Sequence, residues 1–154
     1  MRIEIRKYYI LVYSNRLVRI AGSFVGLGRN AYAFAFWPIL GIRESIKRDL
    51  QLEYGGDLVK ELINHESIHL RQQLELLIIF AHILFFGEFL YAKYIKKMVT
   101  KDAYYWISME QEAHRNATNF NYLNERKPYT LFKYFKNKKH LSRDNFGKLI
   151  EKDY

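Results

Sequence analysis

The sequence contains no cysteine, and this absence excludes three classes of protein. A disulfide-stabilised scaffold, a zinc finger with cysteine ligands and an enzyme with a thiol nucleophile all require that residue. The chain also lacks a glycine-rich loop of the kind that cradles phosphate groups. Because the absence of cysteine is typical of a reducing compartment, we expect a cytoplasmic protein.

No stretch of the chain is continuously apolar over the roughly 20 residues that a membrane-spanning helix needs. The most apolar segment, 74–94, contains two glutamates, and each charge at bilayer depth would cost about 2.5 kcal/mol or more. We therefore expect a buried core helix there, or two helices broken near Gly87. The N-terminal apolar run Tyr8–Tyr13 is too short for a signal-peptide core, so no export signal is expected.

Acidic residues are the minority among the charges, since 16 Asp and Glu against 25 Lys and Arg give a net charge of +9. Such a balance attracts acidic partners, including nucleic acid and anionic lipid. We interpret the basic C-terminal tail, 126–154, as a packed helix with a solvated lysine face, so nucleic acid is not expected as a partner. The apolar segment 76–97 ends in lysines, which keeps peripheral contact with a membrane as an alternative.

The composition, with 49% hydrophobic and 27% charged residues, predicts a folded globular chain, and the length suits a single domain, 1–154. Residues 1–43 are rich in β-branched and aromatic side chains, whereas 57–125 show helical spacing. The predicted strands are Ile3–Tyr13, Leu17–Val25, Ala31–Trp37 and Ile39–Ile42. We expect an α+β fold in which a small N-terminal antiparallel sheet precedes three or four helices.

An HExxH motif, His65-Glu66-Ser67-Ile68-His69, lies on a predicted helix. The two histidines are four residues apart, so both imidazoles project from one face and can bind one metal ion. Glu66 lies about 100° around the helix axis from His65, where its carboxylate can reach a metal-bound water without being a ligand. Zinc lowers the pKa of such a water toward about 7, and the glutamate can then take its proton. This pattern predicts a zinc-dependent hydrolase with Glu66 as the catalytic base.

Two glutamines follow the motif on the same side of the predicted helix. Gln72 comes seven residues after His65 and three after His69, and Gln73 is its neighbour. An amide in this place could hydrogen-bond a ligand histidine or a substrate carbonyl, so both glutamines are candidate substrate-binding residues. The alternative is a polar rim without a role in binding.

Two histidines leave a peptidase-type zinc site one protein ligand short. No histidine follows soon enough on the same helix, so the third ligand should come from another helix, where Glu110 and Glu112 are the candidates. Glu110 shares a mostly apolar helical face with His114, and a carboxylate on a buried face needs a compensating cation. We favour Glu110 and keep Glu112, whose face is more polar, as the alternative. The other interpretation of both is a surface carboxylate.

The motif His65-Glu66-xx-His69, followed by Glu110-xx-Ala113-His114, resembles the zincin metallopeptidases of the gluzincin branch. The pattern looks like that of the CAAX-prenyl-protease and heat-shock membrane-protease type, which carries HExxH and a later ExxAD helix. The chain also resembles small, uncharacterised bacterial proteins with HExxHxxQQ followed by an ExEA segment. The resemblance covers about residues 60 to 120. It implies zinc held by His65, His69 and Glu110, Glu66 as general base, and a peptide or protein substrate.

The chain departs from this family pattern at His114, which stands where the family has an aspartate. That aspartate normally orients a ligand histidine through a hydrogen bond. His114 could accept such a bond, contact the oxyanion or bind the metal, so we count it among the catalytic candidates. The resemblance also implies that an edge strand, here Ala31–Trp37, pairs with an extended substrate. The membrane proteases have several spans and this chain has at most one, so their substrate specificity is not carried over.

A non-catalytic function is the alternative to hydrolysis. In that interpretation the chain is a basic binding module, peripheral to a membrane, whose HExxH motif is structural or holds zinc without turnover. It predicts that Glu66→Gln preserves function, whereas the hydrolase hypothesis predicts loss of activity with zinc still bound. A di-iron carboxylate bundle would need two Glu-xx-His pairs, and only Glu66 and His69 have that spacing.

Overall fold

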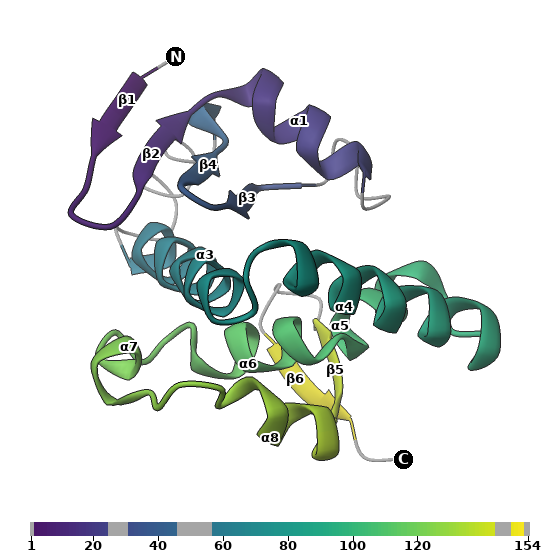
Figure 1. The fold of residues 1–154 in the computed structure, drawn as a ribbon. Helices are drawn as coiled ribbons and strands as arrows, with labels where there is room; N and C mark the ends of the chain where they lie inside the picture. The colour runs from purple at the N-terminus through teal and green to yellow at the C-terminus, as the bar shows by residue number, and fades with distance from the viewer. Residues whose placement is uncertain (1, 25–30, 46–56, 144–148, 153–154) are drawn as a thin grey trace. The chain divides into compact units, whose positions relative to one another are not determined.

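The computed structural model describes residues 2–24, 31–45, 57–143 and 149–152 (Figure 1). The chain forms two compact units, Met1–Arg71 and Gln72–Tyr154, and helix α3 (Asp57–Glu75) begins in the first unit and ends in the second. The first unit holds a four-stranded sheet, and six helical segments follow α3 in the second. The predicted α+β class with an N-terminal sheet is therefore confirmed. The single domain stays a prediction.

The N-terminal sheet has the strand order β1-β2-β4-β3. Its strands are β1 (Arg2–Ile5), β2 (Ile10–Tyr13), β3 (Ala33–Phe36) and β4 (Ile39–Ile42). The pairs β1–β2 and β3–β4 are antiparallel, but β2 and β4 run parallel, with Ile10 opposite Ile39. The sheet is thus mixed rather than antiparallel as predicted. Parallel neighbours need a crossover connection, and helix α1 (Asn15–Phe24) lies in the segment between these two strands.

Helix α1 covers residues 17–24 of the predicted strand Leu17–Val25, so that prediction is wrong there, and Val25 lies outside the described residues. The hydroxyl oxygen of Ser14 accepts a hydrogen bond of 3.3 Å from the Leu17 N–H, which satisfies a donor at the start of the helix. Val18 and Gly22 are buried and lie four residues apart, which is the helical rather than the strand period. Tertiary burial and the capping contact therefore outweigh the strand preference of the β-branched side chains.

The core of the first unit forms where α3 packs on the sheet. Its buried members are Leu11, Tyr13, Leu40, Ile42 and Leu70, and Leu62 and Ile63 of α3 pack against them. The α3 residues recur at helical spacing, as the sequence predicts, and no glycine or proline interrupts them. Packing on the sheet therefore fixes the orientation of α3 about its own axis within this unit.

The second unit is mainly helical. Its segments are α4 (Ile79–Leu90), the π-helix η2 (Tyr91–Ile95), α5 (Thr100–Trp106), α6 (Ser108–Asn116), α7 (Tyr122–Glu125), α8 (Leu131–Lys136) and the hairpin β5 (His140–Arg143) and β6 (Leu149–Lys152). The helical break predicted near Gly87 falls instead after Glu75, where Leu77 and Ile78 have positive φ angles of 55° and 49°. The tail predicted as one helix contains α8 and the hairpin.

The charge that the apolar helix α4 carries, Glu88, is buried and has polar partners. Glu88 accepts hydrogen bonds of 2.8 Å from both the N–H and the hydroxyl of Ser108, the first residue of α6, and it pairs with Lys138. The carboxylate thus caps the N-terminus of α6, where negative charge is favoured. The chain is extended at Ile107, so this part of the stretch 57–125 with helical spacing is divided into α5, α6 and α7.

The sequence predicts no membrane span in the apolar segment 74–94. Among the described residues, no single helix is long and apolar enough to cross a membrane, and Leu58–Glu75 with Ile79–Ile95 pass that test only as a bent pair.

Candidate metal centre

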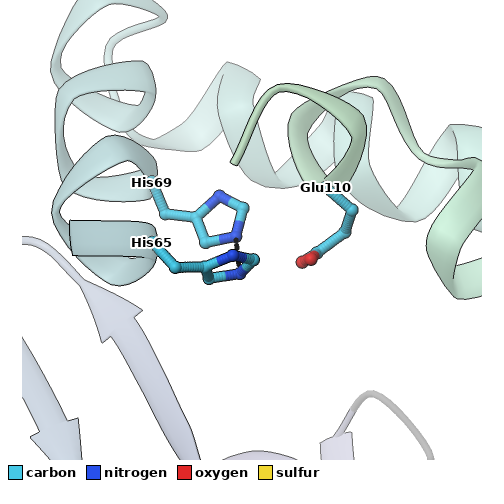
Figure 2. A group of neighbouring side chains, drawn as sticks. All are labelled: His65, His69 and Glu110. Carbon is cyan, nitrogen blue, oxygen red and sulfur yellow. Dashed lines mark hydrogen bonds between the residues drawn. The ribbon is translucent and has the colours of Figure 1, made fainter. Parts of the chain in front are cut away.

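Three side chains predicted as metal ligands lie together in the structure (Figure 2). His65 and His69 project from α3 toward the carboxylate of Glu110 on α6, and the ligand atoms of all three lie within 4.8 Å of one another. All three residues are buried, with exposed fractions of 7%, 7% and 1%. The group could therefore hold a metal ion, as the sequence predicts.

The donor atoms of this group suit a metal ion. The Nε2 atoms of His65 and His69 are 3.1 Å apart, close to the roughly 3.3 Å between two nitrogen ligands of a tetrahedral zinc ion. Two imidazoles and one carboxylate are the donor set of hydrolytic zinc sites, and non-haem iron(II) uses the same types of ligand. Burying a carboxylate is costly, and a divalent cation would offset this cost.

Glu66 is placed on α3 directly after His65, the first histidine of the motif. It is buried, with 7% of its surface exposed. Since α3 is regular from Asp57 to Glu75, Glu66 keeps the position about 100° from His65 that the motif predicts.

His114 lies one helical turn after Glu110 on α6 and contacts it. Its Nε2 is 3.3 Å from the Oε2 atom of Glu110, and its ring packs at 61° on the ring of Tyr105, with the centroids 5.0 Å apart. The family aspartate would orient a ligand histidine, whereas His114 is placed beside the carboxylate candidate. His114 thus contacts the carboxylate of Glu110.

Glu112, the alternative third ligand, is bound within a different cluster. Its carboxylate pairs with the Arg126 guanidinium and accepts hydrogen bonds of 2.9 Å from Gln72 Nε2 and 3.0 Å from the Tyr122 hydroxyl. Arg126 also pairs with Glu75, the last residue of α3. The side chain of Glu112 is fully buried, so the alternative of a surface carboxylate is wrong for both glutamates. The structure brings Glu110, and not Glu112, to the histidines.

The pKa values of this cluster show how strongly its charges interact. Burial alone would lower the pKa of Arg126, but hydrogen bonds to Glu112 and Glu75 and their negative charges raise it above the ordinary value. Burial and the charge of Glu112 both raise the pKa of the Tyr122 phenol. Arg126 is therefore a permanent cation between two carboxylates, and Tyr122 remains a hydrogen-bond donor at neutral pH.

The two glutamines predicted to bind substrate are both buried. Gln72 has no exposed surface, and its amide nitrogen donates to the backbone oxygen of Met109 at 3.2 Å as well as to Glu112. This favours a structural role for Gln72, which fixes the last turn of α3 to α6. Gln73 is 4% exposed, and substrate binding by Gln73 stays a prediction.

Sequence reasoning missed Arg126, which lies in a connecting segment with no periodic pattern. The sequence places it only in the basic tail, 126–154, which we interpret as a packed helix. The available signal was indirect. A buried carboxylate needs a cation, and Arg126 is the first arginine after the helix that carries Glu112.

Comparisons of the chain with protein-family models, with curated proteins and with solved structures find no match. The zincin resemblance therefore rests on the motif residues alone.

Proposed function

We propose that this protein is a zinc-dependent peptidase in which His65, His69 and Glu110 hold the metal ion. The observation that carries the proposal is the buried carboxylate of Glu110, whose oxygen lies within 4.8 Å of both HExxH histidine nitrogens. If the HExxH sequence had arisen by chance, we would not expect a buried carboxylate beside its two histidines from a segment more than forty residues away. When bound, zinc would supply a Lewis acid that polarises a carbonyl and acidifies a water molecule.

Glu66 is the general base in this proposal. Its carboxylate accepts a proton from the water that attacks the carbonyl carbon of the scissile peptide bond. The same carboxyl group then delivers the proton to the nitrogen of the leaving amine as the C–N bond breaks. The products are one carboxylic acid and one amine, and Glu66 returns to its ionised state.

The other residues hold the site in place. His114 contacts the Glu110 carboxylate and limits the directions in which it can point, as partners of metal ligands commonly do. Gln72 and Arg126 fix α6 to the end of α3, so the helix that carries Glu110 has little freedom to shift. These are positioning residues because they act through Glu110 and its helix.

The substrate in this proposal is an extended polypeptide. Among the described residues, β3 is the last strand in the order β1-β2-β4-β3, so a peptide added there would extend the N-terminal sheet. Added strand pairing would hold a peptide by its main chain with little dependence on sequence. The predicted strand Ala31–Trp37 contains β3, and its pairing with a substrate is part of this proposal.

The test of the proposal is hydrolysis of a mixed library of quenched fluorescent peptides by the full chain loaded with zinc. We expect Glu66→Gln to lower kcat at least about 100-fold, the typical contribution of a general base, without loss of zinc. The matched control is Glu61→Gln, the same substitution on the same helix, which should leave kcat unchanged. Zinc-loaded protein without activity, or a Glu66→Gln variant as active as the parent, would instead favour the non-catalytic binding module.

A further inference from the structure

Helix α4 and the π-helix η2 expose one continuous apolar face. We call this surface the α4 apolar face, and its residues are Ile79, Phe80, Ile83, Phe86, Leu90, Tyr91, Tyr94 and Ile95. Their exposed fractions range from 38% for Phe86 to 70% for Ile79. They recur every three or four residues, so they occupy one side of the helix, while Ala81, Glu88 and Ala92 on the other side are buried.

An exposed apolar surface made of eight large side chains marks a site of interaction rather than ordinary protein surface. Single exposed apolar residues are common, but here eight large ones are contiguous along two adjoining helical segments. Gly87 lies between them, and a Cβ built on it would meet no atom within 4 Å, so the centre of the face is open.

The charges that accompany the α4 apolar face in the sequence are mostly positive, with Glu75 and Asp102 just outside the segment 76–101. Between residues 76 and 101 the sequence has four lysines and a single acidic residue, Glu88. That glutamate is 6% exposed and paired with Lys138, so it presents little negative charge to solvent. Lys96, Lys97 and Lys101 are exposed at the C-terminal end of the face and just beyond it.

We propose that the α4 apolar face binds the surface of an anionic lipid bilayer. A helix with one apolar side and lysines beside it lies in the plane of the interface, its apolar side chains buried among the upper acyl chains. Tyr91 and Tyr94 suit the headgroup level because each has an apolar ring and a polar hydroxyl. The lysine ammonium groups then reach the phosphates of anionic lipids. A neutral bilayer surface attracts these ammonium groups far less.

This contact would act on the segment that carries the candidate metal ligand. Glu88 of α4 is bonded to Ser108, the first residue of α6, and Glu110 follows two residues later. A bilayer bound to α4 would therefore lie one short connection from Glu110. The proposal of membrane binding itself does not depend on the metal or on catalysis.

The test is co-sedimentation of the full chain with phosphatidylcholine vesicles, with and without phosphatidylglycerol. We expect the chain to bind the anionic vesicles and to bind the neutral ones more weakly. The double variant Ile83→Ser, Phe86→Ser should lose at least about tenfold in partitioning, because two large apolar side chains no longer enter the bilayer. The double variant Lys96→Glu, Lys97→Glu should partition onto anionic vesicles at least about fivefold less for each lysine replaced, with no change on neutral vesicles.

Matched controls separate this surface from the rest of the protein. Ile5→Ser changes a residue that is 86% exposed on β1, and Lys60→Glu reverses an exposed charge on α3; both should bind as the parent does. Three results would overturn the proposal. The parent chain stays in the supernatant with anionic vesicles; the serine variant binds as well as the parent; or sedimentation equilibrium shows that the α4 apolar face joins two copies of the chain and that the vesicles remain unbound.

Discussion

The amide nitrogen of Gln72 donates a 2.9 Å hydrogen bond to the Oε2 atom of Glu112, forty residues later in the chain. This bond, together with Arg126, takes Glu112 into a buried polar cluster. Glu110, two residues earlier on the same helix, is left on the side of the histidines. The two carboxylates of one ExE segment therefore have different surroundings: Glu112 joins helices, and Glu110 belongs to the group that could hold a metal ion.

Arg126 is expected to be essential for the stability of this cluster. Its side chain is 1% exposed and pairs with both Glu75 and Glu112, so Arg126→Met would leave two buried carboxylates without their cation. Removing one partner of a buried ion pair costs roughly 3–5 kcal/mol. Urea denaturation of the parent and the variant measures this loss of unfolding free energy.

The neighbouring Lys127 provides the control for Arg126. It is exposed, so Lys127→Met should change the unfolding free energy by less than about 0.5 kcal/mol. An Arg126→Met variant as stable as the Lys127→Met variant would show that the cluster does not contribute this much to the unfolding free energy.

Tyr122 gives the cluster a pH dependence that can be measured. Its pKa is raised above 10.0 by burial and by the charge of Glu112, so above pH 10 the unfolded chain ionises this phenol while the folded chain keeps its proton. The stability from the Tyr122 hydrogen bond is therefore complete below pH 10 and lost as the pH rises further. Tyr122→Phe should be less stable by about 1.5 kcal/mol at pH 8, and the difference should narrow above pH 10. A constant difference between pH 8 and pH 11 would contradict the shifted pKa.

His114 is expected to affect metal affinity rather than act on substrate. Loss of a residue that positions a metal ligand typically costs 10- to 100-fold in affinity. We therefore expect His114→Ala to weaken zinc binding by about that factor in a competition with a chromophoric chelator, with the fold intact by circular dichroism. A zinc affinity equal to that of the parent would show that His114 does not position a metal ligand.

Two glycines should respond in opposite ways to alanine. Gly87 is inside α4 with no atom within 4 Å of an added Cβ, so Gly87→Ala should stabilise the protein by about 0.5–1 kcal/mol through helix propensity. At Gly41 on β4 an added Cβ would lie 2.0 Å from the ring of Phe34, which pairs with it across the sheet. Gly41→Ala should therefore destabilise by about 1–3 kcal/mol. Thermal denaturation of both variants measures these shifts, and equal shifts would contradict the packing of Phe34.

Local patterns predicted the elements whose residues repeat regularly. The strand prediction for Ala31–Trp37 followed from alternation, and the α3 helix followed from the spacing of Leu62, Ile63 and the two histidines. Leu17–Val25 was misinterpreted because its β-branched residues favour strands locally, whereas the Ser14 contact and the burial of Val18 favour a helix in the folded chain. The parallel pairing of β2 with β4 depends on contacts across the sheet, which no local pattern encodes.

The candidate site was predicted through spacing and burial. HExxH specifies its own geometry because four residues form about one helical turn, and Glu110 was favoured because its helical face is apolar. The structural role of Gln72 could not be predicted in the same way. Whether a buried amide binds a substrate or a neighbouring helix depends on the position of Glu112 and Met109, which is set by tertiary structure.

The measurement that tests the central claim most directly is the zinc content of purified full chain, by elemental analysis, beside Glu110→Ala and the surface control Glu125→Ala. We predict about one zinc per chain for the parent and the control, and loss of that zinc in Glu110→Ala with the fold retained. The claim that His65, His69 and Glu110 form a metal centre would be contradicted by a parent chain that takes up no zinc, or by a Glu110→Ala variant that binds zinc as tightly as the parent.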